Sequence, residues 1–315
     1  MVRQVMMVMA QLIFILLLAP LVSGVIKKTK AFFQTRRGPG IFQGYLDIYK
    51  WFHKDSVVSE HASWVFTITP YIYFAAVVAA GVLIPTVTTM LPLGFSGDVI
   101  AVIYLFVLGR FFMSLAGLDA GSSFGGMASS REAAVAALIE PAMVLAVFTV
   151  ALDAGSTNLG LISQNFIAGN NDVLSLSHML AFAAMLIVTV AETGRIPIDN
   201  PDTHLELTMI HEGMLLEYSG KKLALMMWGA SVKQLLVFSL LVNTFFPLGI
   251  ATTLNPLSLV LGVAAYLAKI ILVGIFMAIV ETSFVKMRFF KVPDLLAGAF
   301  MLGFMALISN YVLGR

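Results

Sequence analysis

The sequence predicts an all-α, polytopic integral membrane protein with about eight transmembrane helices and an amphipathic surface helix after the first. Of its 315 residues, 59% are hydrophobic and only 11% are charged, a composition that excludes an ordinary water-soluble globular domain. Apolar runs of about 18 to 24 residues recur along the chain, and each is long enough to cross a hydrocarbon core as a helix. Basic residues also gather in alternate loops, as the positive-inside rule requires.

The predicted spans cover residues 5–26, 64–84, 98–117, 133–152, 174–193, 223–246, 257–280 and 293–312. Fourteen of the nineteen Lys and Arg residues lie in the four loops after the odd-numbered spans, whereas the loops 85–97, 153–173 and 247–256 contain none. We therefore expect the four basic loops in the cytoplasm and both termini outside. The first span precedes its basic cluster, so it is interpreted as a retained signal-anchor within a single membrane domain over residues 1–315.

The first cytoplasmic loop contains a predicted surface helix. Ile41, Tyr45, Ile48, Tyr49 and Phe52 recur at helical spacing, which is typical of a short amphipathic helix lying along the membrane surface. Such a helix serves either as an interfacial anchor or as a docking platform for a soluble partner.

The second cytoplasmic loop, 117–132, is rich in glycine and serine. Small residues allow backbones to approach closely. The loop is therefore expected either to pack beneath another subunit or to form a flexible turn.

The segment 192–220 is the most highly charged part of the apolar chain. Six of the seventeen acids and two of the five histidines lie there. Pro197 and Pro201 end the fifth span, and Asn200 is a suitable N-cap for a helix predicted over 201–217. A zinc site is not expected, because H-E-x-x-H is absent and His204 and His211 are seven residues apart. The acids are Glu192, Asp199, Asp202, Glu206, Glu212 and Glu217.

Several charged residues fall inside the spans or just at their ends. A charge that faces lipid costs at least a few kcal/mol, so these side chains must face protein, water or one another. They are either structural ion pairs or members of a proton path. Pro141 follows Glu140 and frees a backbone carbonyl one turn earlier, which favours bound water beside that acid. The residues are Arg110, Glu140, Glu192, Lys233, Lys269 and Glu281, with Asp119 and Glu132 near the cytoplasmic ends.

The chain contains no cysteine. Iron–sulfur clusters need thiolate ligands, and the sequence also has no glycine-rich phosphate loop. We therefore expect this chain to bind no metal, cofactor or nucleic acid, and any electron transfer to take place in partner subunits.

Short motifs occur in a fixed order across the eight spans. They are Arg36-Arg37-Gly38-Pro39-Gly40, Gly117-Leu118-Asp119-Ala120-Gly121-Ser122, Ser130-Arg131-Glu132, Glu140-Pro141, the 192–199 stretch, Glu217-Tyr218-Ser219-Gly220 and Lys286-Met287-Arg288. Together they resemble the family of subunit 1 of respiratory complex I, NuoH. Within that family the sequence is most similar to the membrane subunit of formate hydrogenlyase and other group 4 membrane-bound NiFe hydrogenases, the hydrogenase-4 component C type. Complex I members usually read G-P-N where this chain has Gly38-Pro39-Gly40.

The resemblance implies a subunit of a prokaryotic plasma membrane that is not catalytic alone. Its expected partners are large and small subunits of NiFe-hydrogenase type, which hold the NiFe and iron–sulfur centres on the cytoplasmic side, together with an antiporter-like membrane subunit and the lipid bilayer. The implied proton path comprises Glu140, Glu192, Glu281, Lys233, Lys269 and Arg110. The implied coupling loop and redox-arm interface comprise Arg195, Asp199, Asp202, Glu206, Glu212, Glu217, Arg36, Arg37, Asp119, Arg131 and Glu132.

Other functions stay open at this point. The chain is alternatively the quinone-site subunit of a complex I-type NADH dehydrogenase or a related enzyme. A stand-alone ion-coupled transporter would be expected to show repeat symmetry and broken helices. A purely structural anchor would hold its partners and move no ions.

Overall fold

The computed structural model describes residues 2–89, 98–169, 173–200, 209–253 and 255–313, and within these ranges it is built almost entirely from α-helices. Eight long helices match the predicted spans, so the all-α polytopic class is confirmed. Seven of them are long and apolar enough to cross a membrane by themselves, and the other has 17 residues. They are α1 (Val2–Phe33), α3 (Trp64–Leu83), α4 (Val99–Asp119), α5 (Ser123–Ala154), α7 (Leu176–Glu192), α8 (Gly220–Phe245), α9 (Pro256–Ser283) and α10 (Val292–Leu313).

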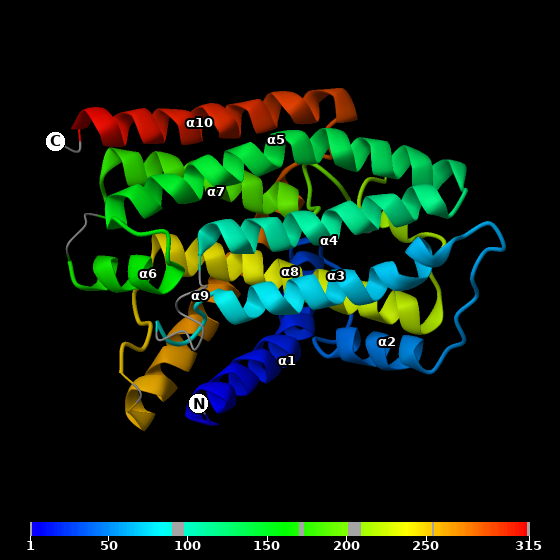
Figure 1. Cartoon of the computed structure of the whole chain (residues 1–315), viewed down its shortest axis with the longest axis horizontal. Coiled ribbons are helices and arrows are strands. Elements are labelled where there is room, and N and C mark those ends of the chain that lie inside the picture. The colour runs from blue at the N-terminus through cyan, green and yellow to red at the C-terminus, as the bar shows by residue number, and fades with distance from the viewer. Residues whose placement is uncertain (1, 90–97, 170–172, 201–208, 254, 314–315) are drawn as a thin grey trace.

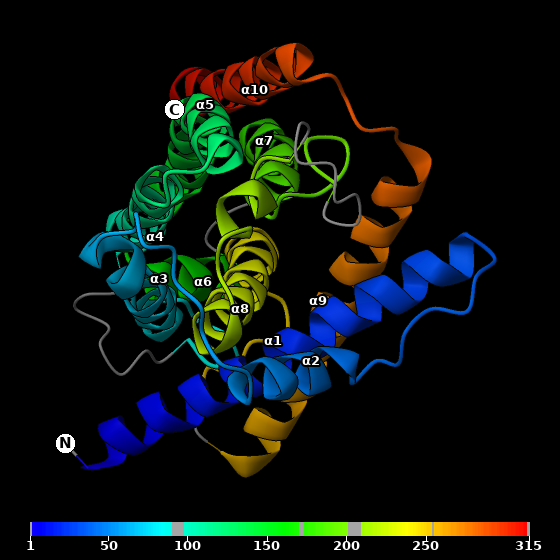
Figure 2. The same cartoon turned by 90° about the vertical axis from the view of Figure 1, so that its right-hand side faces the viewer.

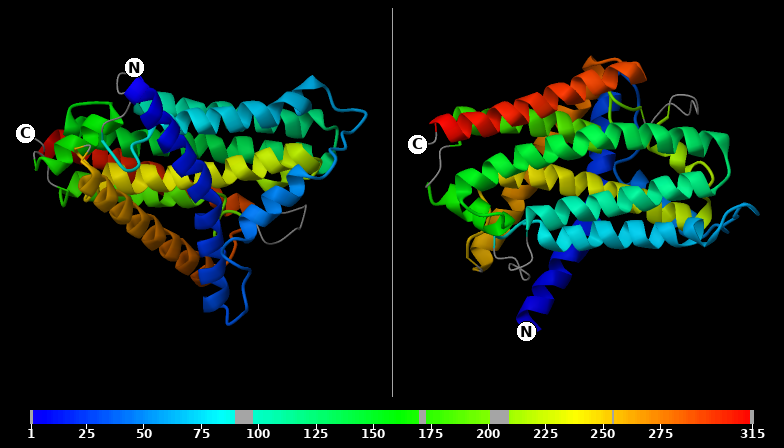
Figure 3. Two further views of the ribbon diagram at one scale, coloured as in Figure 1. Left: turned by 90° about the horizontal axis from the view of Figure 1, so that it is seen from below. Right: turned by 45° about the horizontal axis from the view of Figure 1, so that its top comes forward.

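Helix α8 lies at the centre of the bundle, in contact with α1, α3 and α7. Residues 232–245 are buried on every side, the pattern of a helix enclosed by others. Helices α3, α4, α5, α10 and α7 follow one another around it through successive contacts. Helices α1 and α9 pack together and are inclined to the rest (Figures 1 and 3), and Figure 2 shows α8 between this pair and the α4–α5 side.

The loops gather at two ends of the bundle according to their charge. At one end, three loops without Lys or Arg meet: the Thr89 N–H donates to the Ala251 carbonyl, and Gln164 Nε2 donates to Thr89 Oγ1 at 3.1 Å. At the other end the basic loops meet, for example where Val57 N–H donates to Ser219 Oγ at 2.8 Å. The alternation of basic and neutral loops in the sequence therefore separates the same loops in space.

The glycine- and serine-rich segment 117–132 is mostly helical, contrary to its interpretation as a loop. Ser122 caps α5 by accepting a hydrogen bond from the Gly125 amide, so α5 begins ten residues before the predicted span and only a short turn separates it from α4. The expected close backbone approach does occur, but within the chain. A Cβ added at Gly125 would lie 2.5 Å from the carbonyl oxygen of Gly117.

Two short helices complete the described structure. Helix α2 (Gln43–Phe52) is the predicted amphipathic helix, and it lies against α1 and α8. The Phe52 ring contacts the Trp228 ring edge-on. Helix α6 (Leu159–Ile167) was not predicted; Asn158 caps it by accepting hydrogen bonds from Gly160 and Leu161.

The helix predicted over 201–217 is wrong for the part that the structure describes. Residues 201–208 lie outside the described ranges. Between residues 209 and 217, only Glu212–Leu215 is helical, as a single 3-10 turn. The Asp199 carboxylate accepts hydrogen bonds from the Ile210 and His211 amides, both at 3.1 Å. The Asp199 side chain thus accepts hydrogen bonds from backbone amides that would donate to carbonyls in an α-helix. These contacts hold residues 210 and 211 against the loop after α7.

Candidate functional site

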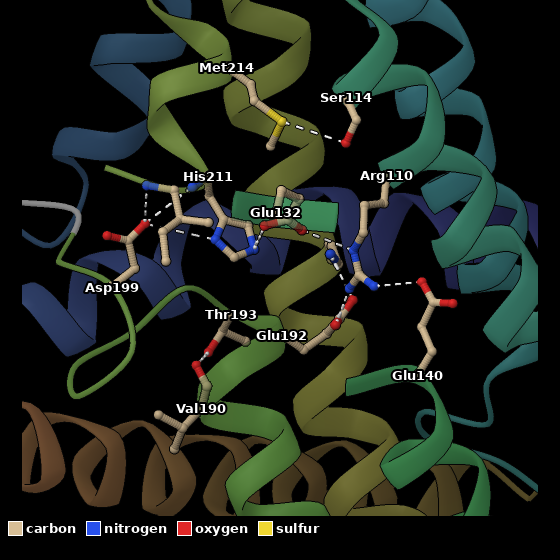
Figure 4. A network of polar contacts seen from close by, with 12 residues as sticks. Arg110, Ser114, Glu132, Glu140, Val190, Glu192, Thr193, Asp199, His211 and Met214 are labelled. Carbon is tan, nitrogen blue, oxygen red and sulfur yellow. Dashed lines mark hydrogen bonds and ion pairs between the residues drawn. The ribbon is translucent and has the colours of Figure 1, made fainter. Parts of the chain in front are cut away.

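Arg110 of α4 is surrounded by three carboxylates from two other helices (Figure 4). Its Nε lies 3.0 Å from Glu132 Oε1 and its Nη1 lies 2.8 Å from Glu140 Oε1, both on α5. Its Nη2 binds Glu192 at the end of α7. The planar guanidinium can satisfy several acceptors at once in this way.

Lys233 of α8 adds a second base to this cluster. Its Nζ lies 2.8 Å from Glu192 Oε1, so both oxygens of the Glu192 carboxylate are paired with bases. The cluster of Arg110, Glu132, Glu140, Glu192 and Lys233 is called the central cluster below. It holds three acids and two bases from four helices, so further positive charge is needed nearby to balance it.

A second cluster joins α1, α9 and the loop after α7. Arg195 Nη1 lies 2.7 Å from Glu281 Oε1, and Lys30 Nζ lies 2.9 Å from Glu281 Oε2. Arg195 also donates to Gln234 Oε1 at 3.0 Å, as does Ser23. Gln234 follows Lys233 on α8, so the two clusters meet there.

Asp199 organises the loop after α7. Besides the Ile210 and His211 amides, its carboxylate contacts Lys286 Nζ at 2.9 Å. Burial by itself raises the pKa of Asp199, but the hydrogen bonds and charges of His211 and Lys286 outweigh it. The net pKa lies well below the ordinary value for an aspartate, because each neighbour favours the charged carboxylate.

His211 lies between the loop and the central cluster (Figure 4). Its Nε2 is 3.4 Å from Glu132 Oε2, and its Nδ1 is 3.8 Å from Asp199 Oδ2. Burial lowers the pKa of His211, but the charges of Glu132 and Asp199 raise it to a net value above the ordinary one. A protonated His211 would supply the positive charge that the central cluster lacks.

A cavity of about 120 Å³ adjoins these groups. Its lining includes Glu192 and Lys233 of the central cluster, Gln234 of the second cluster, and Asp199 and His211 of the loop. A space of this size has room for several water molecules, with the charged and polar side chains of its lining as hydrogen-bond partners. It therefore brings both clusters and the loop to one compartment.

Glu140 borders a different space, at the other side of Arg110. Its side chain is 30% exposed and lines a groove of about 640 Å³ between α4, α5 and α10, together with Ala137 and Pro141. Pro141 has no N–H, so the Ala137 carbonyl in this groove lacks its usual helical partner. Glu140 and Glu192 are both ion-paired and each borders a space, an arrangement compatible both with structural ion pairs and with a proton path.

The structure does not bring every predicted site residue together. Lys269 lies toward the neutral-loop end, where its Nζ donates to Asn243 Oδ1 at 2.8 Å. Asp119 accepts hydrogen bonds from the Ser63 and Phe66 amides and so holds the start of α3. Arg131 donates to the Met209 carbonyl and lies over the Phe289 ring.

The remaining predicted residues lie on the loops. Glu212 lines the 120 Å³ cavity. Glu217, Arg36 and Arg37 are exposed. Asp202 and Glu206 lie outside the described residues.

Four residues of the site were missing from the predicted set: Lys30, His211, Gln234 and Lys286. Lys30 could have been found from helical spacing, because α1 continues past its apolar run and places Lys30 on the face of Ile26, which is buried. His211 was considered only as a zinc ligand. The pairing of Lys286 with Asp199 depends on two loops 87 residues apart, which spacing cannot reveal.

Comparisons with known proteins agree on one family. The model of the family described as NADH dehydrogenase matches residues 5–311. Hydrogenase-4 component C of Escherichia coli (strain K12) is 36% identical over 89% of this chain and 88% of its own length. Formate hydrogenlyase subunit 4 of the same organism is 34% identical over 95% of this chain and 96% of its own length.

A solved structure shares the fold. A chain of the membrane-bound sulfane sulfur reductase, an archaeal respiratory membrane complex, superposes with a TM-score of 0.82 over 97% of this chain and 98% of that chain, at 20% identity.

Proposed function

Because the chain belongs to the NADH dehydrogenase family and is an integral membrane subunit of a multi-subunit redox complex, we propose that it couples electron transfer in its partners to ion translocation. The partners are proposed to be large and small subunits of NiFe-hydrogenase type on the cytoplasmic side and an antiporter-like membrane subunit. They would hold the NiFe and iron–sulfur centres, since this chain has no cysteine. The complex would lie in the plasma membrane of a prokaryote, with both termini of this chain outside.

The observation that carries the proposal is the continuous run of charged groups from the Glu140 groove to the loop after α7. It passes from Glu140 through Arg110 to Glu132 and Glu192, and from Glu132 through His211 to Asp199. A charge change in a docked redox arm would act first on the loop. Because each pair shares a partner with the next, such a change would alter the proton affinity of the buried carboxylates.

The proposal predicts that Glu192→Gln lowers ion translocation together with the hydrogen evolution that is coupled to it. The amide keeps the shape of the side chain but cannot take up a proton. We expect the variant complex to assemble, and ion translocation into membrane vesicles to fall at least tenfold with a loss of coupled hydrogen evolution. Glu60→Gln, at an exposed acid outside the proton path and the coupling loop, should behave as the unmodified protein.

The measurements are dye-reported pH gradients and gas-chromatographic hydrogen, with formate, reduced ferredoxin and NADH tested as electron donors. A protonophore and a sodium ionophore distinguish the transported ion. If Glu192→Gln leaves both translocation and hydrogen evolution unchanged, the coupling role is wrong and the chain is an anchor. Reduction of a quinone by NADH would instead identify the quinone-site alternative, and recovery of the chain without redox subunits would favour the transporter.

A further inference from the structure

We propose that His211 is a proton relay that carries protons between the loop after α7 and the central cluster. The inference rests on the proposed function and adds to it the residue through which the loop and the buried carboxylates exchange protons. His211 was not among the residues predicted for the path. Within the described part of the chain, its ring is the side chain that contacts both Glu132 and Asp199.

A carboxylate oxygen lies near each ring nitrogen, at ion-pair distance and beyond hydrogen-bond distance, so a small movement is needed before a proton is transferred. Glu132 Oε2 lies 3.4 Å from Nε2 and Asp199 Oδ2 lies 3.8 Å from Nδ1. A neutral imidazole has only one N–H donor, whereas the imidazolium has two. The site therefore suits the charged ring at rest, and loss of one proton leaves a nitrogen that can take up another.

Charged groups from every neighbouring element act on the ring. Glu132 comes from α5 and is itself held by Arg110 of α4. Asp199 comes from the loop and is held by Lys286. Lys233 of α8 opposes protonation, Glu192 at the end of α7 interacts with His211, and Glu212 is the next residue along the chain and lines the cavity with His211.

One proton transfer through His211 takes place in two steps. The Nε2–H bond breaks and the proton bonds to Glu132 Oε2, which leaves a neutral ring and an uncharged Glu132 carboxyl group. Rotation of the ring about its Cβ–Cγ bond then turns the vacant nitrogen away from Glu132 and toward the cavity, where a hydronium ion breaks one O–H bond, gives that proton to the nitrogen and leaves as water. The ring is again an imidazolium, and one proton has moved from the loop side to Glu132.

The rotation needs space beside the ring, and Gly194 leaves it. A Cβ added at Gly194 would lie 3.1 Å from His211 Nδ1 and 3.3 Å from its Cγ. The ring also borders the 120 Å³ cavity, and its side chain is 17% exposed. Because Gly194 has no side chain, the His211 ring has space to rotate on this side.

The first experiment replaces the ring. His211→Gln removes proton transfer, and His211→Lys keeps a positive charge between Glu132 and Asp199 while holding its proton near neutral pH. We expect both complexes to assemble, and the rate of ion translocation in membrane vesicles to fall at least tenfold in each. The decline of the unmodified rate as pH rises through the histidine range should be absent from both variants.

The second experiment crowds the ring without changing it. Gly194 and Gly155 have nearly the same backbone conformation, with φ of +61° and +65°, but a Cβ at Gly155 would meet nothing within 4 Å. Gly155→Ala therefore controls for the backbone strain of Gly194→Ala. We expect translocation to fall about tenfold in Gly194→Ala and to stay near the unmodified rate in Gly155→Ala.

The outcomes separate this inference from the function on which it rests. Translocation that survives in His211→Lys, or a pH profile that both variants retain, would show that His211 contributes only charge or packing and would overturn the relay. If Glu192→Gln abolishes translocation while His211→Gln does not, the coupling function stands and the relay alone is wrong. If neither substitution has an effect, both proposals fail.

Discussion

Arg110 is the residue on which most of the buried charge depends. It binds Glu132, Glu140 and Glu192 with three different nitrogens. Its removal would leave these carboxylates close together at membrane depth, with Lys233 beside Glu192 and His211 beside Glu132 as the remaining basic partners. Removing one partner of a buried ion pair typically costs about 3–5 kcal/mol.

We therefore predict that Arg110→Gln prevents stable assembly of the complex. Arg110→Lys should be intermediate, because an ammonium keeps the charge but lacks the planar fork. The amount of complex in membranes is measured by native gel electrophoresis. Lys28→Gln, at an exposed basic residue outside the site, is the control, and normal assembly of Arg110→Gln would contradict the central role of the guanidinium.

At the scale of single residues, the sequence identifies which charges are buried but not how they are paired. Arg110, Glu140, Glu192, Lys233 and Glu281 stand out because each interrupts an apolar run. Two members of the second cluster do not stand out, and one of them is Gln234, which is neutral. Lys30 likewise belongs to a basic stretch that is expected to be solvated.

At the scale of elements, α4 and α5 form a hairpin whose packing depends on glycine. Gly125 approaches the Gly117 carbonyl so closely that a methyl group cannot fit, whereas a Cβ at the adjacent Gly126 would meet nothing within 4 Å. Arg110 lies on α4, and Glu132 and Glu140 lie on α5. The distance between these two helices therefore sets the distances between charged groups in the central cluster.

The pair offers a matched test of the hairpin. Gly125→Ala should destabilise the subunit by about 1–3 kcal/mol through overpacking, while Gly126→Ala should be neutral or stabilise it by up to about 1 kcal/mol. Thermal unfolding of the detergent-solubilised complex measures both. Equal unfolding temperatures for the two variants would exclude close packing of α4 on α5.

Helices can be predicted from the sequence where apolar residues determine them. Helix boundaries that depend on hydrogen bonds between side chains and the backbone cannot be predicted in this way. All eight spans and the surface helix follow from apolar length and spacing. The start of α5 does not, because its first turns are small and polar and are stabilised by the Ser122 cap and by α4. The segment after Asp199 has good helix-capping residues, yet the Asp199 carboxylate takes up the amides of Ile210 and His211.

At the scale of the whole molecule, the arrangement of loops predicts membrane sidedness. Lys54 lies at the end that holds the basic loops, and Thr252 lies at the neutral end; both are exposed. The chain has no cysteine, so one introduced thiol is the only thiol of the subunit. Lys54→Cys and Thr252→Cys therefore report the two ends separately.

We predict that a membrane-impermeant maleimide labels Thr252→Cys in intact cells and labels Lys54→Cys only after the cells are broken. Labelling is read by the mass increase of the purified subunit. The reverse pattern would invert the orientation and place the loop after α7, with Asp199 and His211, on the outside.

The length of α7 bears on the electric field that the subunit experiences. A helix of 17 residues spans about 25 Å, roughly one turn less than an apolar layer of about 30 Å. Glu192 lies at the cytoplasmic end of α7 in the expected topology, so a proton that moves from Glu192 to the opposite side crosses most of the membrane voltage, at about 2.3 kcal/mol per 100 mV for the full drop.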